Sequence, residues 1–304
     1  RLLPKIMVIL SLGFKKEMRL LKTVRSSVRN VGSATEPTSY DGGWIKLAKI
    51  QDNIYRFEEN GVFSYLVVGR KEAVLIDAGY GLSDYKKLCE EFTPLPVTLI
   101  NTHGHVDHIG GDRFFSKLYI HQADAGSIQQ GPGPGERAWV LGDLQKNPLL
   151  PKRFDREKWD YPSITPARLL QGGEILEFGD DLQFEVIWTP GHTPGSISLL
   201  DRERGLLFVG DNFGPEQMWI HLPESNYNDW VESIEKAVAL APYVRTVLSG
   251  HGMPREAEVF KELAAAVADI RLGKADAETY PVDDPAFGET CLKTVFPTFE
   301  VLHN

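Results

Sequence analysis

The sequence has few cysteines, no long apolar run and less positive than negative charge. Its two cysteines, Cys89 and Cys291, lie far apart among 304 residues and outside any C-x-x-C pattern. No disulfide framework is expected, and a reducing compartment, the cytoplasm, is the expected location. The apolar stretch at residues 2–14 is interrupted by Pro4 and Lys5 and is too short to span a bilayer, so we expect no transmembrane segment.

Negative charge dominates, but it is unevenly distributed. Asp and Glu outnumber Lys and Arg by 42 to 33, which gives a net charge of −9. Residues 1–30 carry +7, because eight Lys and Arg face one Glu, and this leaves −16 for the remainder. An acidic body argues against a nucleic-acid partner, since phosphate binding needs a basic surface. We interpret the basic segment as an unstructured or added leader; as a targeting segment it would imply an organellar or secreted protein.

The most informative stretch is Thr102-His103-Gly104-His105-Val106-Asp107-His108, which is followed by Ile109-Gly110-Gly111. It comes directly after the apolar run 97–100, which predicts a buried strand, so the cluster lies at the carboxyl end of that strand. Ligand sites of open α/β sheets lie at this edge. Neutral imidazole and carboxylate groups are the ligands that Zn²⁺ takes in hydrolytic sites. His103 and His105 can converge on one ion, and Asp107 and His108 can point at a second.

Three later segments repeat one pattern, an expected strand followed by a glycine and one potential ligand. The runs 184–188, 206–209 and 244–248 precede Gly191-His192, Gly210-Asp211 and Gly250-His251. The carboxyl ends of these strands can therefore supply the other half of a metal site.

Together, H-x-H-x-D-H and the later lone His, Asp and His resemble the metallo-β-lactamase-fold hydrolases over about residues 42–270. The resemblance implies an α/β fold, a four-layer αβ/βα sandwich of two mixed sheets with the metal site at one sheet edge. It also implies two Zn²⁺ ions per chain, with iron or manganese as alternatives. The implied ligands are His103, His105 and His192 for the first metal, Asp107, His108 and His251 for the second, and Asp211 as the bridge. Asp77, which follows another strand, is expected either to support the ligands or to be a turn or cap residue.

The implied chemistry is hydrolysis of an ester, thioester or lactone by a metal-bridging hydroxide, with a small acyl compound as the partner. Asp107 is expected to be catalytic, orienting the water or moving its proton. Asp211 stands where true β-lactamases of this fold have Cys or Ser, so β-lactam cleavage is expected only as a promiscuous activity. The iron flavoprotein oxidases of this fold usually have Glu at the position of His105, which favours hydrolysis with zinc over redox chemistry with iron. The quorum-quenching lactonases have Tyr at the position of Gly214, which argues against a lactonase. The alternatives are a phosphodiesterase or phosphotriesterase, an iron redox enzyme, and a non-catalytic scaffold.

Apolar residues after the bridging Asp predict the substrate cleft. Phe213, Met218 and Trp219 are expected to line it and to suit an acyl or aromatic group. Ordinary core packing is the alternative for Phe213.

We divide the chain into an extension and linker (1–41), a hydrolase domain (42–272) and a tail that wraps the surface (273–304). Expected strands cover 44–50, 54–58, 63–68, 73–76, 118–120, 174–178, 182–188, 196–200 and 206–209, and expected helices cover 82–92, 107–115, 227–240 and 255–272. An aromatic insertion at 131–166 is expected to cover the metal cleft or to join a subunit interface in a possible homodimer. Its Gly-Pro run at 131–135 is expected to form no regular element.

Overall fold

The computed structural model describes residues 38–157, 159, 161–214, 216–282 and 290–304, and all structural statements below concern these residues. The expected leader at residues 1–30 lies outside them. Among the described residues, every helix is too short or too polar to cross a lipid bilayer.

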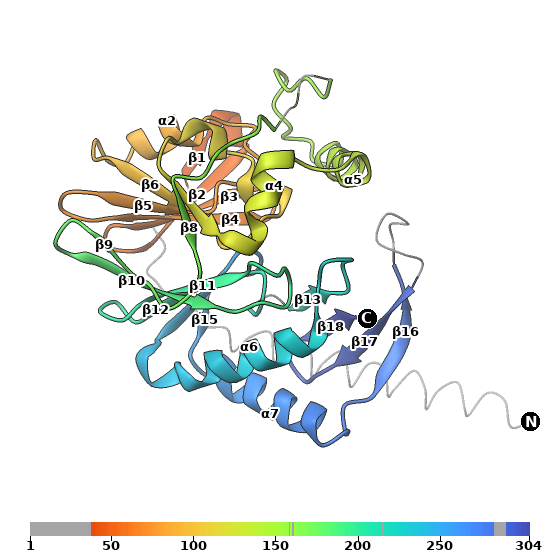
Figure 1. The fold of residues 1–304 in the computed structure, drawn as a ribbon. Helices are drawn as coiled ribbons and strands as arrows, with labels where there is room; N and C mark the ends of the chain where they lie inside the picture. Colours follow the sequence, from red (N-terminus) through yellow and green to blue (C-terminus); the bar gives the residue numbers. More distant parts are fainter. Residues whose placement is uncertain (1–37, 158, 160, 215, 283–289) are drawn as a thin grey trace, which may run out of the picture. The chain divides into compact units, whose positions relative to one another are not determined.

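The first sheet contains eight strands in sequence order, antiparallel from β1 to β5 and parallel from β5 to β8 (Figure 1). Its strands are β1 (Thr38–Tyr40), β2 (Ile45–Gln51), β3 (Ile54–Glu59), β4 (Val62–Val68), β5 (Ala73–Ile76), β6 (Val97–Ile100), β7 (Leu118–His121) and β8 (Arg168–Leu170). The helices in this half are α2 (Tyr85–Glu90), α3 (Val106–Ile109), α4 (Ala125–Gln130) and α5 (Pro134–Leu144). The parallel strands end at one edge, where the first ligand cluster begins.

The second sheet has the order β15-β14-β12-β11-β10-β9. Its strands are β9 (Ile175–Phe178), β10 (Leu182–Trp188), β11 (Ile197–Asp201), β12 (Leu206–Gly210), β14 (Thr246–Ser249) and β15 (Arg255–Glu256). Helices α6 (Tyr227–Ala239) and α7 (Val259–Arg271) belong to this half. Strands β12 and β14 are parallel and buried along their whole length, which explains the continuous apolar run of β12. Strand β14 is equally buried, although it begins with Thr246 and ends with Ser249.

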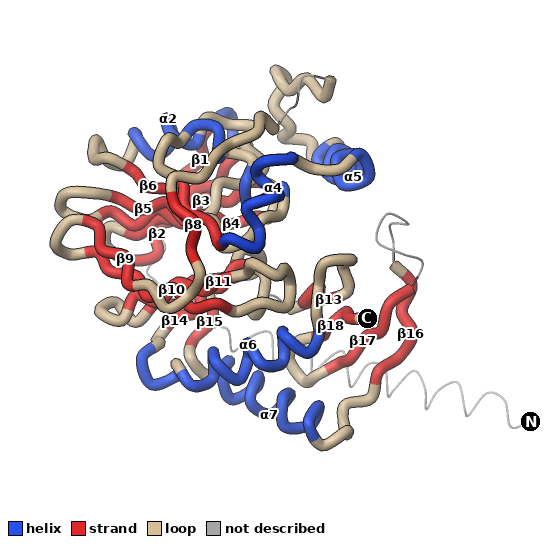
Figure 2. Tube along the Cα trace, viewed as in Figure 1, coloured by secondary structure: helices blue, strands red, loops and turns tan. Residues whose placement is uncertain are grey.

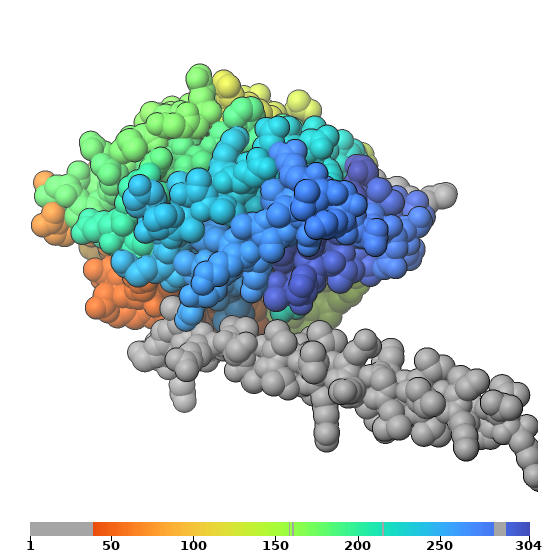
Figure 3. Space-filling model, turned by 90° about the horizontal axis from the view of Figure 1, so that it is seen from below, coloured from red at the N-terminus to blue at the C-terminus, as the bar shows by residue number. Residues whose placement is uncertain are grey.

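Three buried clusters define the layers. One lies between the sheets and combines side chains of both, such as Val67, Val74, Phe184 and Phe208. A second packs the first sheet against α2 and α5, and a third packs the second sheet against α6 and α7. Helices therefore lie outside the strands on both sides (Figure 2). In the view from below, the cyan and blue residues of the second half form one continuous surface (Figure 3). The four-layer sandwich is confirmed.

A third sheet departs from the expected surface tail. It has the order β13-β18-β17-β16, formed by Gln217–Ile220, Glu300–His303, Thr290–Val295 and Ala277–Pro281. Val301 of β18 is fully buried, and β18 pairs in parallel with β13. The end of the segment after residue 272 therefore packs as part of the core beside the second sheet, whereas most of β16 is exposed. This pairing joins residues about 80 positions apart, and no local pattern indicates it.

Three helices begin at other places than expected. Helix α2, expected from residue 82, begins at Tyr85 after the N-cap Asp84. Helix α5 begins at Pro134, inside the Gly-Pro run that was expected to be irregular, because proline is well suited to the first helical position, where its missing N–H is not needed. Helix α7 begins only at Val259, because Arg255–Glu256 pair with β14 as a short edge strand.

Candidate metal centre

Loops from both sheets bring the seven expected ligands to one edge of the sandwich. The loop after β6 and helix α3 carry His103, His105, Asp107 and His108. The turn between β10 and β11 carries His192, and the ends of β12 and β14 carry Asp211 and His251. A sheet edge of this kind can gather side chains that are far apart in the sequence.

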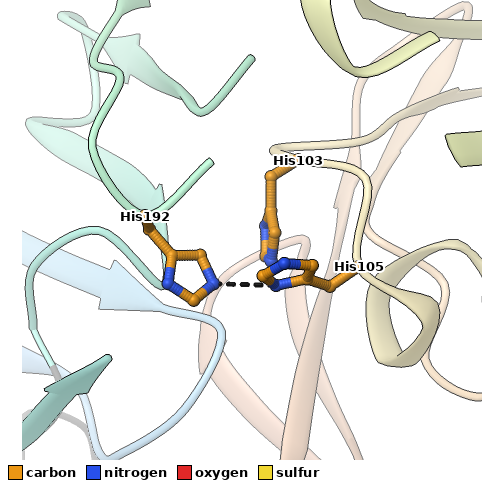
Figure 4. A group of neighbouring side chains, drawn as sticks. All are labelled: His103, His105 and His192. Carbon is orange, nitrogen blue, oxygen red and sulfur yellow. Dashed lines mark hydrogen bonds between the residues drawn. The ribbon is translucent and has the colours of Figure 1, made fainter. Parts of the chain in front are cut away.

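The seven side chains form two groups, in each of which the potential ligand atoms lie within 4.8 Å of one another. The first group is His103, His105 and His192, and the second is Asp107, His108, Asp211 and His251. In the first group the three imidazoles point toward one another, two from one loop and His192 from the facing segment (Figure 4). Each group offers enough nitrogen and oxygen atoms to hold one metal ion.

Asp211 lies between the two groups. Its Oδ2 is 3.2 Å from His251 Nε2 and 3.4 Å from His108 Nε2 in the second group. The same oxygen is 3.7 Å from His192 Nε2 and 4.0 Å from His103 Nε2 in the first. This carboxylate is therefore placed to contact two ions at once.

Each imidazole of the first group has its outward nitrogen bonded to a protein oxygen. The acceptors for His103, His105 and His192 are Thr102 Oγ1 (3.1 Å), Glu224 Oε1 (2.8 Å) and Trp219 O (2.6 Å). Thr102 Oγ1 itself donates to Asp77, so it accepts from His103 Nδ1. Because each outward nitrogen donates a proton to its acceptor, the inward nitrogen of a neutral ring presents its lone pair. The inward atom is Nδ1 in His105 and Nε2 in the other two rings.

In the second group, too, the outward nitrogens are bonded to protein oxygens. His108 Nδ1 donates to Asp77 Oδ2 at 3.0 Å, and His251 Nδ1 donates to the carbonyl of Gly61 at 3.2 Å. Asp77 also accepts from the backbone N–H of Thr102 at 2.7 Å, so it supports loops of both groups rather than serving only as a turn residue.

The inward atoms fit a pair of divalent cations. His103 Nε2, His108 Nε2 and Asp211 Oδ1 are buried and have no hydrogen-bond partner within the described part of the chain. The inward nitrogens of His105 and His192 are joined by a hydrogen bond of 2.9 Å, so without metal one of them carries a proton, which a shared cation would displace. Leaving a buried polar atom without a partner costs about 1–3 kcal/mol, and a shared cation removes this cost.

The electrostatics of the two groups differ. Burial lowers the pKa of His192 to about 4 and that of His103 well below its ordinary value, so both rings are neutral, as metal ligands must be. Burial alone would also lower the pKa of His251, but Asp211 and Asp107 outweigh it and raise the pKa to about 10. In the second group a proton therefore stands where a cation would bind, and metal binding would release it.

Two residues that the motifs did not indicate hold the ligand loops. Asp124 accepts hydrogen bonds from Gly104 N (2.9 Å), Thr193 Oγ1 (2.6 Å) and Gly195 N (2.7 Å), so it ties the loop of His105 to that of His192. Glu224 holds His105 itself. The position of Asp124 shortly after a buried strand is a weak signal for such a role, and Glu224 lies in no recognisable pattern.

A cavity of about 560 Å³ opens onto the two groups. Its wall includes Trp219, as expected, and it also includes Glu136 and Trp139 of α5. The expectation that the insertion covers the cleft therefore agrees with the position of α5.

The expected contacts of Phe213 and Met218 need correction: both are fully buried in the core beside α6 and α7. On β13, alternate side chains face opposite sides, so Trp219 at the cavity places Met218 in the core.

Known proteins have sequences similar to this one. A family profile described as Metallo-beta-lactamase superfamily matches residues 58–251, which include every ligand position. Acyl-coenzyme A thioesterase MBLAC2 of Gallus gallus is 34% identical over 209 residues, covering 64% of this chain and 75% of the relative. Hydroxyacylglutathione hydrolase GloC of Haemophilus influenzae is 27% identical over 187 residues, covering 60% of this chain and 81% of the relative.

Among solved structures, the crystal structure of TTHA1623 in a di-iron-bound form has a TM-score of 0.50 and 25% identity. The match covers 66% of this chain and 93% of the chain in that structure. The resemblance predicted from the motifs is confirmed, as is the prediction of an enzyme of this metallo-hydrolase family. The chain belongs to the metallo-beta-lactamase superfamily.

Proposed function

We propose that this protein is a thioester hydrolase that holds two zinc ions between its seven ligand side chains. The observation that carries the proposal is the set of inward nitrogen and oxygen atoms on both sides of Asp211, which lie at a cavity with aromatic walls. The relatives support the thioester class. One is named for acyl-coenzyme A thioesterase activity and the other for hydrolysis of hydroxyacylglutathione.

Zinc is proposed on the donor set, because five imidazoles and two carboxylates suit zinc in hydrolytic sites. Iron is the competing metal, since TTHA1623 was solved with two iron ions. When bound, the metal pair supplies an activated water and positive charge for the oxygen that becomes negative during attack on the acyl carbon.

The protein's own side chains position the substrate and move protons. Trp139 and Trp219, with ring centroids 5.9 Å apart, form an apolar wall that can pack on the acyl group and exclude water. Asp107 also lines the cavity. Burial alone would raise the pKa of its carboxyl, but His108 and His251 outweigh burial and hold the pKa well below its ordinary value. Asp107 is therefore ionised at neutral pH and can accept a proton beside the substrate.

The test combines metal analysis by mass spectrometry with a hydrolysis panel of acyl-coenzyme A, acylglutathione, lactones, p-nitrophenyl esters and phosphodiesters. We expect about two zinc ions per chain, the highest kcat/KM on thioesters, and loss of activity after chelation. A preference for phosphodiesters would overturn the substrate class. Iron without hydrolysis would overturn the reaction.

Asp107→Asn is expected to retain most of the metal and to lower kcat by about 100- to 10,000-fold, because the amide cannot accept the proton. Metal content and steady-state kinetics on a thioester check this result. An unchanged kcat in a fully loaded variant would show that Asp107 is a ligand and not a proton acceptor.

Trp219→Ala is expected to raise KM for the preferred thioester by about tenfold, because it removes apolar contact area from the cavity wall. The size of the increase should grow with the length of the acyl chain. Tyr243→Ala, at an exposed aromatic residue outside the cavity, is the control. Equal KM values for both variants would remove Trp219 from the substrate site.

A further inference from the structure

The segment 217–226, which comprises β13 and the loop that leads to α6, contacts two of the three histidines of the first group. Trp219 accepts the hydrogen bond of His192 Nδ1 through its carbonyl, and Ser225 Oγ donates to the carbonyl of His192 at 2.8 Å. Glu224 accepts from His105 Nε2 at 2.8 Å. One short segment therefore supports ligands that come from two different loops. Its residues Trp219 and Glu224 also line the substrate cavity.

The Glu224 contact determines which nitrogen of His105 faces the site. An ionised carboxylate can only accept hydrogen bonds, so the ring carries its proton on Nε2 and presents the lone pair of Nδ1 inward. A carboxylate behind a ligating imidazole fixes both the ring's orientation and its tautomer, and it makes the inward nitrogen a better ligand.

His105 depends on this contact more than its two neighbours depend on theirs. The exposed fraction of its side chain is 17%, against 1% for His103 and 4% for His192, so packing restrains it least. The outer acceptors of the other two rings are a buried hydroxyl and a backbone carbonyl of a strand. The outer acceptor of His105 is a side chain on a loop.

We infer that Glu224 is the positioning residue for His105, and that through it the segment 217–226 orients the first group and not the second. The inference rests on the proposed function only in requiring that the two groups bind metal. The second group has its own outer acceptors, Asp77 and Gly61. Without metal, Glu224 and His105 form only a partly exposed ion pair, which adds little to the stability of the fold.

The experiment measures Co²⁺ affinity in the full-length protein after chelation, by titration against a chromophoric chelator. Glu224→Ala should lower the affinity for one of the two ions by about 10- to 100-fold and leave the affinity for the other unchanged. Glu224→Gln should weaken the same ion less, because its amide oxygen still accepts from His105. Glu232→Gln, which removes the same charge from an exposed position of α6, should bind both ions as the wild type does. The metal-free proteins should all melt at the same temperature.

A second variant tests whether Glu224 acts through His105. In a His105→Ala background, Glu224→Ala should cause no further loss of affinity. A wild-type affinity for both ions in Glu224→Ala would overturn the inference and leave the proposed function standing. A further loss in the His105→Ala background, or equal weakening of both ions, would also overturn it. A wild-type protein that binds no Co²⁺ would overturn the proposed function together with the inference.

Discussion

Gly250→Ala is expected to lower metal content and thioester hydrolysis by about a hundredfold. A Cβ at this position would lie against Asp211 Oδ1 and 2.5 Å from His108 Cε1. The backbone of Gly250 is outside the left-handed region, so alanine adds only the steric effect of its methyl group.

The backbone at Gly250 has little freedom to move the methyl group away. Its N–H donates to the carbonyl of Gly210 at 2.8 Å, and its own carbonyl accepts from Phe63 N at 2.7 Å. These bonds join β12 and β4 to the loop that carries His251. The side chains of Asp211 and His108 must therefore give way, and both leave their ligand positions when they do.

Gly142→Ala is the matched control for this variant. A Cβ at Gly142 meets no atom within 4 Å, and alanine favours the helical conformation of α5 by about 1 kcal/mol. Metal analysis, kinetics and thermal denaturation should show an unchanged metal content for Gly142→Ala and a depleted but folded Gly250→Ala. A fully loaded and active Gly250→Ala would show that Asp211 and His108 can shift without cost, which contradicts the ligand geometry.

The strands and the ligand positions were predictable because both depend on local patterns. Apolar or alternating runs of four to seven residues with turn residues on either side mark the strands, and the structure places β3, β5 and β10 within one residue of their expected bounds. Each metal-ligand candidate lies in the loop or short helix that follows a strand. The carboxyl ends of strands in both sheets meet at one edge, so the convergence of the seven side chains followed from the strands.

The third sheet and the outer hydrogen bonds were not predictable, because they depend on contacts between distant segments. The parallel pairing of β13 with β18 turns an acidic tail into part of the core and decides that Trp219, rather than Met218, faces the cavity. Asp124 and Glu224 act on loops about 70 and 119 positions away. Charged residues in loops are common; only the position of Asp124 shortly after a strand gives a weak signal, and nothing in the sequence distinguishes Glu224 from a solvated residue.

Asp77→Asn is expected to weaken the binding of both metal ions by about 10- to 100-fold. Asp77 accepts three hydrogen bonds, from Thr102 N at Oδ1 and from Thr102 Oγ1 and His108 Nδ1 at Oδ2. Asparagine offers one oxygen, and its amide group meets a donor in either orientation. At least one buried donor therefore loses its acceptor, which costs about 1–3 kcal/mol.

Backbone strain does not complicate this variant. Asp77 has a φ of 58°, in the left-handed region that asparagine also tolerates. Asp112→Asn is the matched control, because Asp112 is equally buried, burial raises the pKa of its carboxyl well above the ordinary value, and an asparagine oxygen can still accept the hydrogen bond from Asn101 Nδ2. Co²⁺ titration of the two proteins should show weakened binding only for Asp77→Asn.

The number of ions affected distinguishes Asp77 from Glu224. Asp77 holds His108 directly, and it holds His103 through the hydroxyl of Thr102, so it supports one ligand in each group. Its loss should lower the affinity for both ions, whereas loss of Glu224 should lower the affinity for one. If Asp77→Asn weakened only a single ion, the hydroxyl of Thr102 would have to hold His103 without the carboxylate behind it, and the two groups would then be supported independently.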